Sequence, residues 1–258
     1  MGFFVELNQR VRERRSLLCV GLDPDPALMP DLPELRGPQG LATFCGAIIA
    51  ATRDLVCAYK PNLAFFLAYG SAGMRALEQT LAEIPPHIPV VLDAKIGDIG
   101  STQRKYGQAV FGALGADAVT VSPYVGEDAV LPLLEDYPKR GVFVLARTSN
   151  PGAQRFQDHP GSGPRLVDRV VEAALGWAQA YPQSTVGLVA GSTHPGDLQA
   201  IRAVAPAWPV LIPGVGAQGG ALETCVQFGS AADGTGPLIN VSRAVIHASR
   251  GPDYADAA

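Results

Sequence analysis

The chain has 258 residues and a formal net charge of -4, with 47% apolar and 17% charged residues. This composition is too apolar and too weakly charged for a disordered chain, and it supplies enough apolar side chains for a large core. The slight acidity excludes a general basic field of the kind that attracts nucleic acid or acidic lipid. We therefore expect no nucleic-acid partner, and an anionic ligand must be held by local groups.

The cysteines and the N-terminal segment bear on the cellular compartment of the protein. Cys19, Cys45, Cys57 and Cys225 form no C-x-x-C pair and lie in apolar runs, as buried free thiols do. The first fifteen residues lack the apolar stretch and cleavage site of a secretion signal, and no window approaches 18 uncharged apolar residues. These features predict a reducing, cytoplasmic location and no membrane contact.

Short β-rich runs alternate with stretches of helical spacing along the chain. After an N-terminal helix at 3–15, the predicted strands are 17–22, 56–60, 90–93, 118–122, 142–146, 186–190, 210–212 and 238–241. The predicted helices between and after them are 41–54, 72–84, 101–114, 127–137, 164–181, 195–205, 219–227 and 243–249, followed by a flexible tail at 251–258. Nearly continuous apolar strands are typical of a parallel sheet covered by helices. Eight such units predict an α/β fold, a (β/α)8 TIM barrel formed by residues 1–258 as a single domain.

An open doubly wound sheet is the structural alternative. Gly214-x-Gly216-x-x-Gly219 fits the dinucleotide fingerprint between a strand and a helix. It follows the seventh strand rather than the first, however, and only Asp233 offers a ribose partner downstream. The barrel is therefore favoured, and the carboxyl ends of its strands are the place to look for chemistry.

Two of the four lysines in the chain, Lys60 and Lys95, stand at the ends of the second and third predicted strands. A lysine can release a proton near neutral pH whereas an arginine cannot, so this placement indicates proton chemistry. Asp93 and Lys95 are two residues apart on a strand and so share a face, and Asp98 follows in the loop. We expect the four charges to alternate, which keeps Lys95 protonated and ready to act as an acid. A purely structural ion pair is the alternative.

The same cluster argues against a metal site, because two interleaved ammonium groups oppose a divalent cation. The four histidines, His87, His159, His194 and His247, also show no ligand spacing. We therefore expect neither a metal nor a cofactor.

The loops after the seventh and eighth strands commonly bind phosphate in this fold. The first of these loops runs from Gly214 to Gly220, and the second carries Arg243, whose guanidinium can hold a phosphate bidentately. Two ordinary glycine turns are the alternative. Ser149 opens a third loop, rich in Pro and Gly, which fits either a lid over a ligand or a plain surface loop.

Together these positions resemble the orotidine 5'-monophosphate decarboxylases, in particular their longer bacterial subgroup, over the whole stretch from Asp23 to Arg243. The residues that carry the resemblance are Asp93-x-Lys95-x-x-Asp98, Lys60, Gly214-Val-Gly-Ala-Gln218-Gly and Arg243. The D-x-K-x-x-D spacing alone is shared by related barrels that act on sugar phosphates. Its combination with the other positions is far more specific.

The resemblance implies decarboxylation of orotidine 5'-monophosphate to uridine 5'-monophosphate, the last step of de novo pyrimidine nucleotide synthesis, without a cofactor and in a homodimer. Lys95 would protonate C6 of the pyrimidine, Asp93 would lie against the departing carboxylate, and Lys60 would orient Asp93 and the ribose. The implied substrate-binding residues are Asp23 at a ribose hydroxyl, Ser149 at the pyrimidine, and Gln218, Gly219 and Arg243 at the 5'-phosphate. Asp98 and Thr102 would complete the site of the neighbouring subunit.

Two other functions stay open at the level of sequence. One is a metal-dependent sugar-phosphate decarboxylase or aldolase of the same barrel superfamily, and the other is a non-catalytic nucleotide-binding barrel. Ile96, Ser122 and Arg147 also depart from the Arg, Asn and Lys that are more frequent in the longer subgroup. These departures concern loop contacts rather than the reaction.

Overall fold

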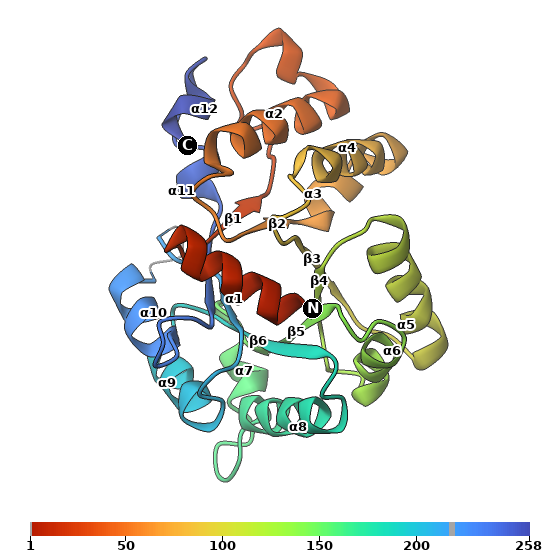
Figure 1. The fold of residues 1–258 in the computed structure, drawn as a ribbon, viewed down its shortest axis with the longest axis vertical. Coiled ribbons are helices and arrows are strands. Elements are labelled where there is room, and N and C mark those ends of the chain that lie inside the picture. The colour runs from red at the N-terminus through yellow and green to blue at the C-terminus, as the bar shows by residue number, and fades with distance from the viewer. Residues whose placement is uncertain (1, 217–219) are drawn as a thin grey trace.

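A computed structural model describes residues 2–216 and 220–258 of the chain. In this part of the protein, eight parallel strands form one sheet in the order β2-β1-β8-β7-β6-β5-β4-β3. Isolated bridges between Tyr59 and Val90 and between Asn62 and Asp93 join β2 to β3 and close the sheet. Helices surround the strands (Figure 1). The predicted (β/α)8 barrel is confirmed.

The strands lie where the sequence predicts them, with bounds that differ by no more than three residues. They are β1 (Leu18–Leu22), β2 (Ala58–Pro61), β3 (Val91–Ile96), β4 (Ala118–Val121), β5 (Gly141–Arg147), β6 (Thr185–Ala190), β7 (Val210–Ile212) and β8 (Pro237–Val241). The helices are α1 (Phe3–Arg14), η1 (Pro33–Leu35), α2 (Gly37–Thr52), α3 (Leu63–Leu67), α4 (Gly70–Glu83), α5 (Gly100–Gly107), η2 (Gln108–Ala113), η3 (Glu127–Ala129), α6 (Leu131–Asp136), α7 (Gln154–Gln157), α8 (Leu166–Ala180), α9 (Pro195–Val204), α10 (Leu222–Gly229), α11 (Arg243–Ile246) and α12 (Tyr254–Ala257).

Four helices were not predicted: η1, α3, α7 and, in the tail, α12. A short helix, α3, precedes α4; Asn62 caps it by accepting a hydrogen bond from the Ala64 amide, and Gly70 adopts a left-handed φ of 58° where α4 begins. The tail, expected to be flexible, contains α12. The ring of Tyr254 stacks on Phe44 with centroids 5.2 Å apart, so a contact distant in sequence holds this segment.

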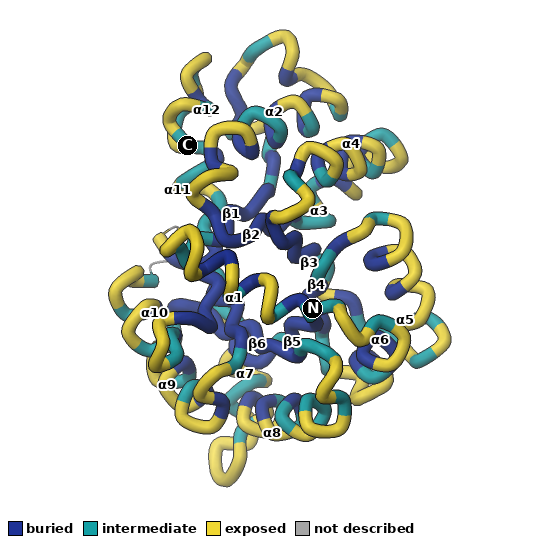
Figure 2. Tube along the Cα trace, viewed as in Figure 1, coloured by how far each residue is buried: buried dark blue, intermediate teal, exposed yellow. Residues whose placement is uncertain are grey.

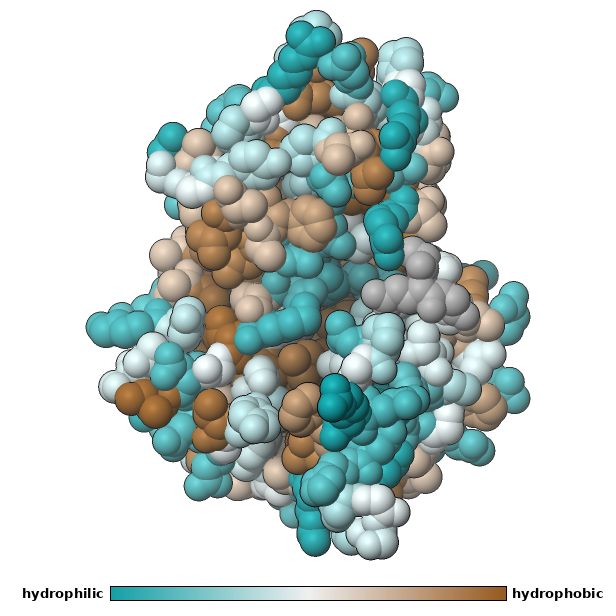
Figure 3. Space-filling model, turned by 180° about the vertical axis from the view of Figure 1, so that it is seen from behind, coloured by the Kyte–Doolittle hydropathy of each residue, from teal (hydrophilic) through white to brown (hydrophobic). Residues whose placement is uncertain are grey.

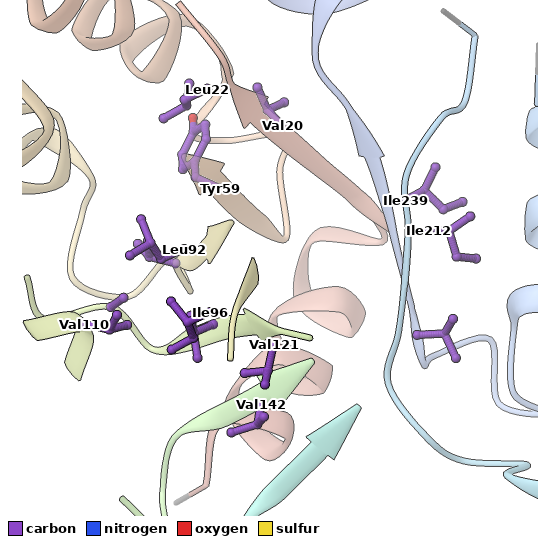
Figure 4. Close-up of a cluster of buried hydrophobic side chains, with 14 of the residues drawn as sticks. Val20, Leu22, Tyr59, Leu92, Ile96, Val110, Val121, Val142, Ile212 and Ile239 are labelled. Atoms are coloured by element: carbon purple, nitrogen blue, oxygen red, sulfur yellow. The ribbon is translucent and has the colours of Figure 1, made fainter. Parts of the chain in front are cut away.

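Alternate strand residues face opposite sides of the sheet, and both sides are filled with apolar side chains. On the helix-facing side, Val20, Leu22, Tyr59 and Leu92 belong to one large buried cluster (Figure 4). Inside the barrel, a second cluster contains Cys19, Ala58, Val91, Phe143, Val189, Leu211 and Leu238. The strands are accordingly buried while the outer faces of the helices are exposed (Figure 2).

Helix α1 closes one end of the barrel, in front of the strands in Figure 1. Phe3 and Leu7 of α1 join the interior cluster, and the Phe3 ring meets Phe143 edge-on with centroids 5.9 Å apart. A Cβ on Gly141 would lie 2.6 Å from the Phe3 ring, so only glycine allows this approach. Because α1 covers the amino ends of the strands, the carboxyl ends are the open side. In the described part of the chain, no helix is both long and apolar enough to cross a membrane.

We predict that Phe3→Ala lowers the free energy of unfolding by about 3–5 kcal/mol, because it leaves a cavity at the closed end of the barrel. Phe3 is 2% exposed, whereas Val5, on the same helix, is 54% exposed. Val5→Ala should therefore stay within about 0.5 kcal/mol of wild type. Urea unfolding at one protein concentration measures both. Equal effects from the two substitutions would show that α1 does not plug the barrel.

Candidate active site

A cavity of about 260 Å³ opens at the carboxyl ends of the strands. It lies on the side of the barrel opposite α1, which Figure 3 shows with hydrophilic side chains gathered near its centre. Six of the predicted site residues line it, namely Asp23, Lys60, Asp93, Lys95, Ser149 and Arg243. Gln218 and Gly219 lie outside the described residues, so the structure does not address their predicted role.

Asp93 is the centre of the charged cluster. Its Oδ2 accepts a hydrogen bond from the Nζ of Lys60 at 2.9 Å, and its Oδ1 accepts one from the Nζ of Lys95 at 2.5 Å. The side chain of Lys60 is 4% exposed and that of Lys95 is 52% exposed. The two cations therefore differ in accessibility. Lys60 is buried at the wall of the cavity, whereas the Lys95 ammonium is exposed to a ligand.

The charges of this cluster stabilise one another. Burial disfavours the ionised form of Asp93, but the neighbouring Lys60 and Lys95 ammonium groups outweigh it and hold the pKa of the carboxyl far below its usual range. Burial likewise works against the charged form of Lys60, but Asp93 and Asp23 more than compensate and raise the pKa of its ammonium. Asp93 and Lys60 therefore both stay charged at neutral pH.

Thr120 of β4 is a member of the cluster that sequence reasoning missed. Its hydroxyl donates to Asp93 Oδ1 at 2.9 Å, and the residue is 1% exposed. Its position two residues before the predicted strand end at Ser122 placed it on the inward face, which was a usable signal. Asn62 and Asn240, which also line the cavity, were missed as well.

Asp98 and Thr102 are not among the residues that line the cavity. Asp98 Oδ1 accepts a hydrogen bond from the Ile99 amide at 2.7 Å. Among the described residues, one chain therefore brings together Lys60, Asp93 and Lys95 but not the fourth expected charge.

The rim of the cavity carries the predicted anion-binding groups. Arg243 lies at the start of α11, and Gly214 lines the cavity with a positive φ of 94° that only glycine adopts readily. On another side, Ser149 follows Arg147, whose buried guanidinium pairs with Asp158 at 2.7 Å and with Asp197 at 3.0 Å. These ion pairs fasten the loop after β5 to the helices outside the barrel.

In residues 2–216 and 220–258, no group of three or more His, Cys, Asp or Glu side chains is arranged to hold a metal ion. All four cysteines are buried and free, and burial raises the pKa of the Cys57 thiol to about 12, which leaves it unreactive at neutral pH.

The chain is thus a (β/α)8 barrel whose cavity, at the carboxyl ends of the strands, contains two lysines beside two aspartates. The sequence profile of the orotidine 5'-phosphate decarboxylase / HUMPS family matches residues 16–257, and the chain belongs to this family. The resemblance noted from the sequence is thus confirmed. The chain is 50% identical, over its full length and 91% of the relative, to a protein named orotidine 5'-phosphate decarboxylase from Thermomicrobium roseum.

Solved structures also match this chain. The structure of Leishmania donovani OMP decarboxylase matches with 40% identity and a TM-score of 0.85, over 100% of this chain and 94% of the other. That of Leishmania donovani UMP synthase matches with 42% identity and a TM-score of 0.88. The present chain spans only 54% of the latter chain, so the similarity covers about half of that protein.

We predict a pH-dependent loss of stability for Asp93→Asn. The pKa of Asp93 is lower in the folded than in the unfolded protein, so its ionisation stabilises the fold at neutral pH, and this contribution is lost as the pH falls below about 4. The substitution also leaves two ammonium groups without their carboxylate, at a cost of about 3–5 kcal/mol at pH 7. The deficit relative to wild type should shrink between pH 6 and pH 3 in urea unfolding.

The matched control is Asp54→Asn, at a surface position whose side chain is 76% exposed. Its effect should stay below about 1 kcal/mol at every pH. A deficit for Asp93→Asn that is the same at pH 3 and pH 6 would contradict the lowered pKa.

Proposed function

We propose that this protein is a carboxy-lyase that converts orotidine 5'-monophosphate to uridine 5'-monophosphate, in de novo pyrimidine nucleotide synthesis. The observation that carries the proposal is the Lys60–Asp93–Lys95 cluster in the cavity of a chain that belongs to the orotidine 5'-phosphate decarboxylase / HUMPS family. The four buried free cysteines suit a reducing compartment, and we infer a cytoplasmic location from them.

The charge of the cavity suits an anionic substrate. Its lining contains two carboxylates, Asp23 and Asp93, and three cations, Lys60, Lys95 and Arg243. The described lining therefore has an excess of one positive charge, whereas the substrate carries a phosphate and a carboxylate. Arg243 offers a bidentate fork to the phosphate, and Lys95 offers a single compact charge at the reacting end.

The reaction that we propose needs no cofactor. The bond between C6 and the carboxylate breaks, carbon dioxide leaves, and the electron pair stays on C6 in the plane of the ring. The Lys95 ammonium stabilises this carbanion electrostatically and then donates its proton to C6. Asp93 remains ionised beside the departing carboxylate and holds Lys95 in place, while Lys60 orients Asp93. Enzymes reach accelerations of up to about 10¹⁷-fold, and binding energy from a remote phosphate helps to supply such values.

The other predicted roles concern binding. Asp23 Oδ1 is buried and has no hydrogen-bond partner among the described residues, so it is available to accept a ribose hydroxyl. Ser149 hydrogen-bonds the pyrimidine from the loop after β5. Gln218, Gly219 and Arg243 hold the 5'-phosphate.

We further propose a homodimer in which Asp98 and Thr102 complete the site of the neighbouring subunit. Both residues follow β3, and neither lines the cavity of its own chain. Large apolar side chains are exposed beside them and in the loop after the adjacent strand β4, namely Ile99 (61%), Tyr124 (81%) and Val125 (54%). An apolar surface of this kind suits a contact with a second copy.

The test is the ultraviolet absorbance of orotidine 5'-monophosphate incubated with purified protein and a chelator. Wild type should convert it to uridine 5'-monophosphate, whereas Lys95→Ala should lose at least about 10⁴-fold in kcat because it lacks the proton donor. The variant should still bind the product by calorimetry. Lys139→Ala, an exposed lysine away from the cavity, is the control and should keep wild-type kcat.

Each other outcome has a distinct meaning. Loss of wild-type turnover on adding the chelator would indicate a metal-dependent relative. Product binding without any turnover by wild type would indicate a non-catalytic barrel. Near-normal kcat in Lys95→Ala would refute the assignment of the proton donor.

The shared site gives a separate prediction. Asp98→Ala and Lys95→Ala chains should each be inactive alone, and in a mixed population of dimers each hybrid should contain one site with neither substitution. Exchange of subunits should therefore restore about one quarter of the wild-type activity. Two affinity tags verify that hybrids form. Isolated hybrids without activity would show that Asp98 acts in its own chain.

A further inference from the structure

We propose that Thr120 is a positioning residue for proton transfer: its hydroxyl holds the bulge of β3 from which Asp93 and Lys95 project. This inference rests on the decarboxylation proposed above, because it explains how that reaction's acid is placed. Thr120 is buried under the cluster, at 1% exposure, and it acts through its neighbours.

The pairing of β3 with β4 is irregular at the catalytic residues. Leu92 pairs with Val119 and Ile96 pairs with Val121, so three residues of β3 stand opposite Thr120 alone. Leu92, Ile96 and Val121 all belong to the helix-facing cluster of Figure 4, which fixes both ends of the bulge. The segment between these ends, 93–95, cannot continue the regular ladder.

The Thr120 side chain replaces the missing backbone partners. Its Oγ1 accepts the amides of Ala94 at 3.1 Å and Lys95 at 3.0 Å. It also donates to Asp93 Oδ1 at 2.9 Å. A hydroxyl has one proton and two lone pairs, so these three hydrogen bonds use its whole capacity and leave none for substrate.

Lys95 needs such a support because its backbone is in a disfavoured conformation. Its φ is 47°, in the left-handed region that residues with a side chain rarely adopt. Among the described non-glycine residues only Arg15 shares this feature, and it lies at the end of α1, where left-handed caps are common. At Lys95, by contrast, the left-handed conformation occurs inside the site. In this conformation the ammonium lies against Asp93 and donates a hydrogen bond to it.

The hydroxyl is therefore expected to affect the chemical step rather than capture of the substrate. Thr120→Val keeps the shape of the side chain but leaves two amides without their acceptor and removes one of the two hydrogen bonds to Asp93 Oδ1. A displacement of the proton donor by about 1 Å can cost on the order of 10²-fold in rate. Arg243 and Asp23, which bind substrate in the proposed function, are not contacted by Thr120 in any described hydrogen bond.

The test compares Thr120→Val, Thr120→Ser and Thr80→Val in the decarboxylase assay. Thr80 is another buried threonine, whose hydroxyl donates to Ala76 in α4, so its substitution controls for the loss of a buried hydroxyl elsewhere. We expect kcat to fall by about 10–100-fold in Thr120→Val with KM changed by less than about 3-fold. Thr120→Ser and Thr80→Val should retain wild-type kcat within about 3-fold.

A second measurement does not depend on a variant that folds. Amide hydrogen exchange in the wild-type protein should show the Ala94 and Lys95 amides protected. Rapid exchange of both amides in wild type would overturn the proposal. So would a wild-type kcat in folded Thr120→Val, or equal losses in Thr120→Val and Thr120→Ser. Absence of turnover by wild type would refute the proposed function instead, and the exchange result would still decide whether Thr120 holds the bulge.

Discussion

One buried carboxylate, that of Asp93, lies between two ammonium groups and contacts both the junction that closes the barrel and the exposed lysine of the cavity. Seven of the strand pairs in the barrel form hydrogen-bonded ladders, but β2 and β3 are joined only by isolated bridges. The ion pair from Lys60 on β2 to Asp93 on β3 crosses this junction under the cavity. Burying an ammonium without a partner costs free energy of desolvation, and the ion pair with Asp93 offsets this cost for Lys60. The same carboxylate also holds the Lys95 ammonium. Asp93 therefore takes part both in closing the barrel and in placing the proposed proton donor.

The irregular pairing of β3 and β4 shows how the fold accommodates this cluster. A continuous ladder would pair the amides of this segment along β4 and would not require the left-handed turn at Lys95. Local order is instead supplied by Thr120 below the bulge and by two apolar clusters around it, one facing the helices and one inside the barrel. A strained backbone conformation persists where several independent contacts stabilise it, and the bulge that carries Lys95 has such contacts in the Thr120 hydroxyl and the surrounding apolar side chains.

Much of this arrangement follows from the period of the sequence. Continuous apolar runs predicted the strands, and the even spacing of Asp93 and Lys95 placed both on the inward face. The bulge could not be predicted from this pattern, because the two extra residues in β3 preserve the alternation of inward and outward side chains. The spacing from Ser122 placed Thr120 on the inward face, but its residue type did not mark it as functional, since threonine is common in strands. In the tail, Tyr254 of α12 packs on Phe44, a contact that no local pattern encodes.

The departure at Arg147 has a physical explanation in the loop after β5. Its side chain is 3% exposed, and its guanidinium reaches two carboxylates on different elements, Asp158 beyond α7 and Asp197 in α9. Two of its nitrogens contact Asp158 in a fork, at 2.7 and 3.2 Å, which the single ammonium of a lysine cannot reproduce. Ser149 is only two residues from this anchor. Through these ion pairs Arg147 fastens the end of β5, and with it the loop that carries Ser149, to the elements outside the barrel.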